Sequence, residues 1–318
     1  MKKLLATIAT FFLLLPAIAQ DLLKGLEDSV PSPEKVAYAF KSTRVINAHS
    51  IELLSKGNLD FRILHRFGRV NSGVSQWFGL DAASMRMSLD YGLTNDLMIG
   101  IGRSTFRKEV DGFVKARFLQ QTTGGSHPMP FSLVLAAGST IWTGASPTTV
   151  KPSTSDRTSY YLQLLIGRKF NERFSLQLSP MYLRRNMVDR PAEDFALFAL
   201  GGGARYKVSQ RIALTIDYHH ALSGIPAANT DPLSLGVDIE TGGHVFQLHF
   251  INAVGMNERA YITETTDQFF KGDIRFGFNL SRMFNIGGSR KKGWNDQEGA
   301  VQGKRDAPGA RKKEKLAN

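Results

Sequence analysis

The feature that most constrains this chain is a period-two alternation of apolar and polar residues between residues 57 and 284. In the segment 212–219, every second residue is Ile, Leu, Ile or Tyr, and the residues between them are Ala, Thr, Asp and His. The segments 84–91, 233–240 and 273–280 alternate in the same way. Because successive side chains of a strand point to opposite faces, each segment predicts a strand with one apolar and one polar face.

Twelve segments of this kind follow one another along the chain. We predict strands at 59–67, 82–91, 97–105, 110–119, 131–141, 158–169, 174–184, 195–207, 212–220, 233–241, 243–251 and 273–284. Most of them have close to the ~9–11 residues that a tilted strand needs to cross a bilayer. The pattern therefore predicts an all-β fold, an antiparallel transmembrane β-barrel of about 12 strands.

The connections between these segments alternate in length. Short polar turns are expected at 93–97, 170–174 and 208–212, and Gly242-Gly243 supplies a fourth, because glycine accepts the positive φ that two-residue hairpins need. The links after the first, fifth, seventh, ninth and eleventh strands are longer. This alternation is typical of outer-membrane barrels, whose tight turns face the periplasm, and an even strand number places both termini there.

A soluble alternative has the same alternation. A lipocalin-like barrel or a β-sandwich also has one apolar face per strand, but that face lies inside. The apolar face of these twelve strands is almost free of charge, and tyrosines lie near several strand ends, where an aromatic girdle of a membrane barrel is found. These tyrosines are Tyr91, Tyr160, Tyr182, Tyr206 and Tyr218. Both observations favour lipid on the outside.

The first residues predict export. Lys2 and Lys3, an apolar run over 4–15 and the small-residue site Ala17-Ile18-Ala19 are typical of a secretory signal peptide over 1–19. This run is too short for a membrane anchor, and no later run approaches the ~18 apolar residues of a membrane helix. The chain has no Cys, which excludes disulfides, thiolate metal sites and Cys nucleophiles.

The same patterns divide the chain into a signal peptide (1–19), a pre-barrel segment (20–56), the barrel (57–284) and a tail (285–318). The tail is basic and poor in apolar residues, which predicts disorder. Either it contacts an anionic periplasmic partner or it is merely solvated. The net charge of +12 is also typical of nucleic-acid binding, but an exported protein meets little nucleic acid, so we expect none as a partner.

The pre-barrel segment has two interpretations. Ser32-Pro33-Glu34 is expected to start a short helix, because proline suits the first helical turn. Residues 40–51 then either fold into the barrel as a plug or cover its mouth, or they form a flexible lead-in, since termini are often loose unless they are tied down.

Several runs also resemble a family of uncharacterised bacterial β-barrel proteins that is classed as a domain of unknown function. The resemblance covers residues 41–284, and its most distinctive run is Asp238-Ile239-Glu240-Thr241-Gly242-Gly243-His244-Val245-Phe246-Gln247-Leu248-His249-Phe250. Shorter matching runs are 43–47 with His49-Ser50, 65–68, 100–105 and 168–170. The resemblance implies a signal peptide and an outer-membrane barrel, and it implies no activity. This chain departs from the family in having 34 residues after Phe284.

The polar faces of the strands would line the interior of a membrane barrel. The lumen-facing candidates are Arg62, Arg86, Lys115, Arg117, Arg205, Lys207, Asp217, Asp238, Glu240, Gln247 and His249. Charges inside a membrane protein generally find partners, so we expect ion pairs across strands, with a mildly cationic lumen as the alternative. His249 with Gln247, Asp238 and Glu240 forms the densest polar cluster, which is more often structural than functional.

No other motif points to chemistry. His219 and His220 are adjacent on a strand and face opposite sides, so they cannot bind one metal together. His49-Ser50 suggests a Ser–His hydrolase, but adjacent residues cannot form the hydrogen-bonded nucleophile–base pair. Gly201-Gly202-Gly203 is expected to allow a bend or a bulge rather than a ligand contact. We therefore expect no cofactor, no metal and no catalytic residue.

The sequence leaves three functions in order of preference. The first is a pore or transporter for a small solute in the cell outer membrane. The second is a non-conducting binding or scaffold barrel of the cell envelope, and the third is a membrane-embedded hydrolase, which rests on analogy of fold alone. The expected partners are outer-membrane lipids and the barrel assembly machinery. The solute is not predicted.

Overall fold

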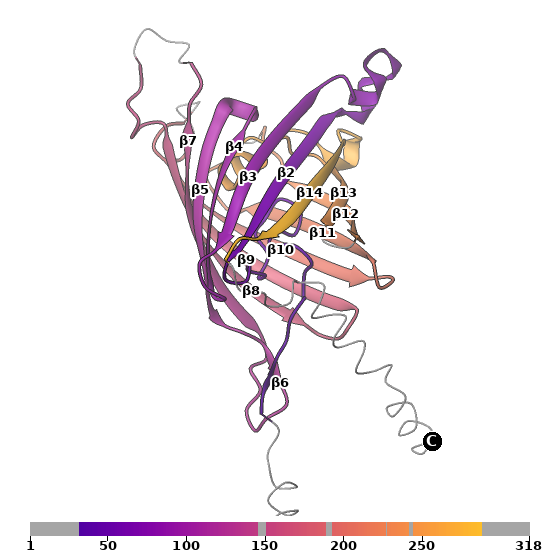
Figure 1. Ribbon diagram of the computed structural model, residues 1–318. Coiled ribbons are helices and arrows are strands. Elements are labelled where there is room, and N and C mark those ends of the chain that lie inside the picture. The colour runs from indigo at the N-terminus through magenta and orange to yellow at the C-terminus, as the bar shows by residue number, and fades with distance from the viewer. Residues whose placement is uncertain (1–31, 146–150, 189–192, 227, 242–243, 288–318) are drawn as a thin grey trace, which may run out of the picture.

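The computed structural model describes residues 32–145, 151–188, 193–226, 228–241 and 244–287 (Figure 1). The predicted signal peptide, the Gly242-Gly243 turn and residues 288–318 of the predicted tail lie outside these residues. Within them, no helix is long and apolar enough to cross a membrane.

Twelve antiparallel strands close into one barrel, as the alternation predicts. They are β2 (Asn58–Arg69), β3 (Ala83–Gly92), β4 (Leu97–Ser104), β5 (Glu109–Leu119), β7 (Ser132–Trp142), β8 (Thr158–Lys169), β9 (Phe174–Arg185), β10 (Ala196–Lys207), β11 (Ile212–Ala221), β12 (Leu233–Thr241), β13 (His244–Ile251) and β14 (Arg275–Asn285). Each strand pairs with its neighbours in chain order, and β14 pairs with β2 to complete the ring. The predicted strand bounds are confirmed to within two residues at most ends.

The two faces of the strands differ as a membrane barrel requires. Outward side chains are apolar and exposed, as at Ile101, Leu178 and Leu214, with exposed fractions of 58%, 49% and 49%. The charged and amide side chains of the strands lie on the inward face and are buried, as at Arg62 and Gln247, with exposed fractions of 1% and 2%. Buried apolar side chains such as Leu165 and Met181 share this inward face. The outer face is apolar and the charged side chains lie inside, the reverse of a soluble barrel, so the soluble alternative is excluded.

The barrel has two unlike ends. At the end where β2 begins and β14 ends, tight turns at 93–96, 170–173 and 208–211 join the strands, and we call this the turn end. At the opposite end, which we call the loop end, lie α2 (Glu258–Thr263) and the short 3₁₀ helices η1 (Val70–Ser72), η2 (Val74–Gly79), η3 (Phe106–Lys108) and η4 (Phe269–Lys271). An even number of strands brings the chain in and out at the same end.

One connection at the turn end is long. Residues 120–131 contain β6 (Thr122–Thr123), which pairs with β1 (Glu34–Lys35) below the barrel (Figure 1). The helix start expected at Ser32-Pro33-Glu34 is therefore wrong. Proline fixes φ at a value that an extended chain also accepts, and the free edge of β6 offers this segment backbone partners that an isolated helical turn lacks.

The bulge expected at Gly201-Gly202-Gly203 is also wrong. These residues pair in continuous register with β9 on one side and β11 on the other. Gly203 instead makes room for a side chain, because a Cβ there would stand 2.9 Å from Val45 Cγ2. Gly201 and Gly203 thus make room for neighbouring side chains inside the barrel, in a strand without a bulge.

Candidate functional site

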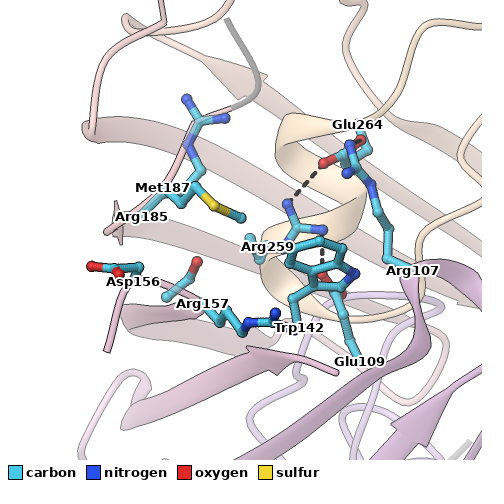
Figure 2. A pocket seen from close by; sticks show the side chains of 10 residues that line it. Arg107, Glu109, Trp142, Asp156, Arg157, Arg185, Met187, Arg259 and Glu264 are labelled. Atoms are coloured by element: carbon cyan, nitrogen blue, oxygen red, sulfur yellow. Dashed lines mark hydrogen bonds and ion pairs between the residues drawn. The ribbon is translucent and has the colours of Figure 1, made fainter. Parts of the chain in front are cut away.

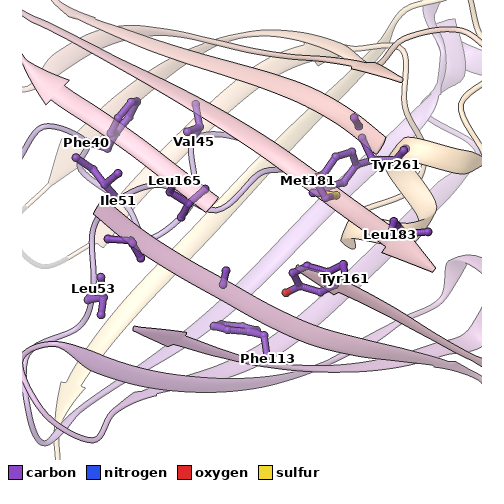
Figure 3. Packing of buried hydrophobic residues seen from close by; sticks show 14 of the residues in the cluster. Phe40, Val45, Ile51, Leu53, Phe113, Tyr161, Leu165, Met181, Leu183 and Tyr261 are labelled. Carbon is purple, nitrogen blue, oxygen red and sulfur yellow. The ribbon is translucent and has the colours of Figure 1, made fainter. Parts of the chain in front are cut away.

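The barrel interior is filled by the chain that precedes it. Residues 39–54, here called the lumen segment, are all buried. Phe40, Val45, Ile51 and Leu53 belong to one buried apolar cluster with inward residues of the strands, and Figure 3 shows them between strands of the barrel wall. Of the two interpretations that the sequence left open for residues 40–51, the structure has the segment inside the barrel.

The middle of the lumen segment is a tight hairpin. The Val45 backbone N–H donates to Ala48 O at 2.8 Å, and the Ser50 N–H donates to Thr43 O at 3.0 Å. Arg44 and His49 form the bridge that closes it. Only a few backbone groups are satisfied within this hairpin, so the others need partners from the barrel wall.

Asp217 of β11 binds the tip of this hairpin. Its Oδ2 accepts the backbone N–H groups of Ile46, Asn47 and Ala48 at 3.3, 2.8 and 3.0 Å. Three donors converging on one carboxylate oxygen form an anion-binding nest, and such charge-assisted hydrogen bonds are stronger than neutral ones. The carboxylate therefore fixes the tip at one height in the lumen.

Amide side chains bind the carbonyl groups. Gln247 Nε2 donates to Val45 O at 2.7 Å, Asn279 Nδ2 to Ile46 O at 2.9 Å, and Gln177 Nε2 to His49 O at 2.8 Å. These three residues come from β13, β14 and β9. The hairpin is thus held from several sides of the ring, and its irregular backbone is tolerated at membrane depth because protein surrounds it.

Cationic side chains complete the enclosure. Arg62 donates to Ser42 Oγ at 2.8 Å and to Thr43 Oγ1 at 2.7 Å, and its charge is balanced by Asp60 at 2.7 Å. Lys115 Nζ donates to Glu52 O at 2.5 Å and to Thr43 O at 3.2 Å. The inner-face charges thus bind the lumen segment as well as each other.

A second closure descends from the loop end. Residues 252–267, here called the cap loop, contain α2 and are mostly buried. The helix begins at Asn257, whose side chain accepts the Ala260 N–H at 2.9 Å. Asn257 Nδ2 donates to Glu109 of β5 at 2.7 Å, which attaches the helix start to the barrel wall.

The two closures meet at Glu258. Its Oε1 lies 2.8 Å from Arg44 Nη1 and 3.2 Å from His49 Nε2, and all three side chains are about 1% exposed. His49 Nε2 also lies 3.0 Å from Tyr161 OH of β8. Burial, followed by the positive charges of Arg44 and Lys115, holds the pKa of His49 well below its usual value despite Glu258. Arg44, whose Nη1 lies closer to Glu258 than the His49 ring does, is the cation that balances this carboxylate.

A small pocket lies at the loop end, beside the cap loop (Figure 2). Arg259 pairs with Glu109 of β5 and, at 2.8 Å, with Glu264, while Arg107 pairs with Glu264 at 2.6 Å. Arg157 stacks over Trp142, with its guanidinium carbon 4.8 Å from the ring centroid. The guanidinium groups at this rim are thus largely used to hold the cap loop in place.

The structure buries or half-buries all eleven lumen-facing candidates, on the inner face. Six of them contact the lumen segment directly, and they are Arg62, Lys115, Arg117, Asp217, Glu240 and Gln247. Arg86 pairs with Asp111 at 2.5 Å, and Arg205 lies 4.0 Å from Asp238. Lys207 lines a groove at the turn end.

The expected polar cluster around His249 is only partly assembled. Gln247 Nε2 donates to Asp238 Oδ1 at 3.0 Å. Glu240 instead pairs with Lys41 of the lumen segment at 2.9 Å. His249 is 2% exposed, and neither ring nitrogen has a hydrogen-bond partner among the described residues. Among those residues, no group of three or more His, Asp or Glu is placed to hold a metal ion.

The hydrolase suggested by His49-Ser50 is not formed. Ser50 Oγ donates to Ser42 O at 2.5 Å, whereas His49 turns to Glu258 and Tyr161. Sequence reasoning missed the Arg44–Glu258 pair, whose members are 214 residues apart. Arg44 is a single charge between uncharged neighbours, and this pattern could have indicated that it needs a buried partner. Nothing in the sequence marked Glu258 as that partner.

A family model described as "Membrane bound beta barrel domain (DUF5777)" matches residues 40–284. The chain belongs to this family. The match begins at residue 40, so the family's domain includes the lumen segment as well as the strands. The protein is thus a membrane-bound β-barrel, and the resemblance noted from the sequence is confirmed.

Solved structures with similar folds include porins and an enzyme. The NanC porin is 11% identical with a TM-score of 0.44, over 71% of this chain and 98% of that chain. The KdgM porin is 10% identical with a TM-score of 0.42, over 71% and 99%. Outer membrane phospholipase A from Escherichia coli is 11% identical with a TM-score of 0.42, over 76% and 98%. These likenesses are too distant to support an argument about function, and no curated protein matches the chain.

Proposed function

We propose that this family member is a gated conduit for small polar solutes in the outer membrane, and that the lumen segment and the cap loop hold it closed. The observation that carries the proposal is the burial of all residues from 39 to 54 inside the barrel, where polar side chains of the wall bind their backbone. An open porin has a water-filled lumen, whereas a fully packed scaffold has no need of a polar interior.

The contacts between the lumen segment and the barrel wall are of a kind that allows the segment to leave the barrel. The wall holds the lumen segment by hydrogen bonds from Arg62, Lys115, Gln247 and Asn279, and water can replace such bonds when the segment leaves. It also holds the segment by apolar contacts, and their exposure on withdrawal is the cost that keeps the closed state favoured. At the turn end the segment continues into β1, whose two residues are both exposed. A periplasmic partner that binds this strand would therefore hold the part of the chain from which the segment can be withdrawn.

Glu258 couples the two closures. Withdrawal of the lumen segment would remove Arg44 and leave the Glu258 carboxylate buried without a cation. An uncompensated buried charge is strongly destabilising, so the cap loop would move toward solvent in response. Withdrawal of the lumen segment at the turn end would thereby open the barrel at both ends.

A disulfide lock tests this gate. The chain has no Cys, and Val45 Cβ lies 3.5 Å from the position of a Cβ at Gly203, which is within the range of disulfide-bonded pairs. Val45→Cys/Gly203→Cys therefore ties the lumen segment to β10. The readout is conductance of the refolded full-length chain in a planar bilayer, with Val45→Cys alone as the matched control.

The gate predicts rare, voltage-induced openings of the wild type, none from the oxidised lock, and their return after reduction. A variant that lacks residues 20–54 and has the cap loop replaced by a short Gly-Ser linker should give steady conductance steps. Steps from the oxidised lock would contradict the proposal. Silence from this double deletion, once heat-modifiable migration shows that its barrel is folded, would instead favour the non-conducting scaffold.

A further inference from the structure

A serine and a histidine face each other across one glycine on the inner wall. Ser179 of β9 pairs with Gly201 of β10, which pairs with His219 of β11. A Cβ on Gly201 would stand 2.3 Å from Ser179 Oγ and 2.3 Å from His219 Nε2, so the two atoms are at most twice that distance apart. The missing side chain at residue 201 is what allows this approach.

A carboxylate lies on the other side of the same imidazole. Asp217 is two residues before His219 on β11 and faces the same side of the strand. Its Oδ1 lies 3.3 Å from His219 Nδ1, while its Oδ2 binds the lumen segment. The order is therefore hydroxyl, imidazole, carboxylate. The contact between Asp217 Oδ1 and His219 Nδ1 is an ion-pair contact and not a hydrogen bond, and Ser179 Oγ is not hydrogen-bonded to His219 Nε2. Catalysis by these groups requires both contacts to shorten when a substrate binds, so that the base activates the nucleophile and the carboxylate orients the base.

The groups that would react have no hydrogen-bond partner in the part of the chain that the structure describes. Ser179 Oγ and His219 Nε2 are both buried, and neither has a hydrogen-bond partner among the described residues. The same holds for the hydroxyl of Tyr261, whose ring centroid is 5.1 Å from that of His219. Buried polar atoms are nearly always paired, so a cluster of unpaired ones calls for an explanation such as a catalytic role.

We propose that Ser179, His219 and Asp217 form an acyl-transfer site for a small ester that enters the lumen. Ser179 Oγ attacks the ester carbonyl carbon, and His219 Nε2 takes the hydroxyl proton and gives it to the leaving alcohol. Water then attacks the acyl-serine, again through His219, and releases the carboxylic acid and the free hydroxyl. Asp217 orients the imidazole and stabilises its charged form.

The cap loop controls access to this site. Tyr261 belongs to α2, and its ring packs against the imidazole, so movement of the cap loop uncovers His219. The proposal needs only this opening and does not depend on solute conduction. The competing explanation is that both side chains fill the space over Gly201 and have no chemical role.

The test is labelling of the refolded full-length chain with diisopropyl fluorophosphate, followed by intact mass and peptide mapping. Serine oxygen bonds to phosphorus, fluoride leaves, and His219 takes the proton. We expect one adduct, on Ser179, that Ser179→Ala abolishes and that His219→Gln slows ~100-fold or more. Ser88→Ala is the matched control, because Ser88 Oγ is also buried without a partner and should not be the labelled serine.

Two glycine variants distinguish a catalytic role of Ser179 and His219 from a role in packing alone. Gly201→Ala would force Ser179 and His219 apart and should abolish labelling. Gly202→Ala should keep the wild-type rate, because the nearest atom to its new methyl group is 3.9 Å away. Heat-modifiable migration checks that each barrel is folded.

Either of two results would overturn the proposal. The first is the absence of an adduct on Ser179 in the folded protein, both with the native cap loop and with the cap loop replaced by a Gly-Ser linker. The second is an equal labelling rate in His219→Gln and in the wild type, which would show an accessible hydroxyl without a base.

Discussion

The lumen segment and the cap loop fill the same barrel but are held in different ways. The lumen segment has one tight hairpin, and most of its other backbone partners are side chains of the strands. The cap loop has its own helix, with Asn257 as its cap and Thr265 Oγ1 donating to Tyr261 O at 2.7 Å. The cap loop can therefore keep its shape when it moves, whereas the lumen segment has this shape only inside the barrel.

The lumen segment and the cap loop also differ in the contacts that attach them to the barrel. The lumen segment depends on buried contacts that solvent and salt hardly reach, namely hydrogen bonds, apolar packing and the Arg44–Glu258 pair. The cap loop is attached at the rim by ion pairs, including Arg275 with Asp267 at 2.8 Å and Arg107 with Glu264 at 2.6 Å. Rim pairs are partly exposed and are screened by salt. Four experiments test this contrast, from the largest expected effect to the smallest.

The first experiment breaks the contact between the two closures. Arg44→Met leaves the Glu258 carboxylate buried without its cation, and removal of one member of a buried pair costs about 3–5 kcal/mol. We expect a loss of this size in the free energy of unfolding, measured by urea titration in detergent. The double variant Arg44→Met/Glu258→Gln should recover most of it, and a double variant as unstable as the single one would contradict the account.

The second experiment loosens only the lumen segment. Asp217→Ala leaves three backbone N–H groups at residues 46–48 without their acceptor, and an unsatisfied buried group costs about 1–3 kcal/mol. Amide hydrogen exchange should become faster at residues 46–48 and stay unchanged in α2. Equal acceleration in both regions would mean that the two closures move as one body.

The third experiment uses the pH dependence of the free energy of unfolding, to which His49 contributes at the contact between the two closures. Because the pKa of His49 is lowered in the folded protein, the unfolded chain binds more protons as the pH falls below ~6.5. Stability is therefore full above that pH and decreases below it, by at most ~1.4 kcal/mol per pH unit for one such group. His49→Asn should reduce this slope, and the same slope in His49→Asn and in the wild type would contradict the account.

The fourth experiment loosens only the rim. Glu264→Gln weakens the pairs with Arg107 and Arg259, which at partly exposed positions are worth about 0–1 kcal/mol. Limited proteolysis within 252–267 should become faster, and high salt should reduce the difference between the variant and the wild type. The lumen segment should stay protected throughout, since its contacts do not involve this rim.

The sequence by itself determined the barrel. Period-two alternation depends only on neighbouring residues, because the pleat of a strand sends every second side chain to the same face. Strand number, strand bounds and the inner face with Arg62, Asp217 and Gln247 could therefore be predicted before any coordinates. The two predictions that failed are the helix start at Ser32-Pro33-Glu34 and the bulge at Gly201-Gly202-Gly203. Both rested on short runs whose conformation a distant partner decides.

Only the tertiary structure decided what lies inside the barrel. The burial of residues 39–54, the Arg44–Glu258 pair and the approach of Ser179 to His219 all join segments that are far apart in the chain. Their positions depend on closure of the ring, on the register between strands and on the depth to which two irregular segments enter the lumen. An irregular segment has no periodic pattern to reveal its surroundings, because its polar backbone groups find their partners on strands that come together only when the ring closes.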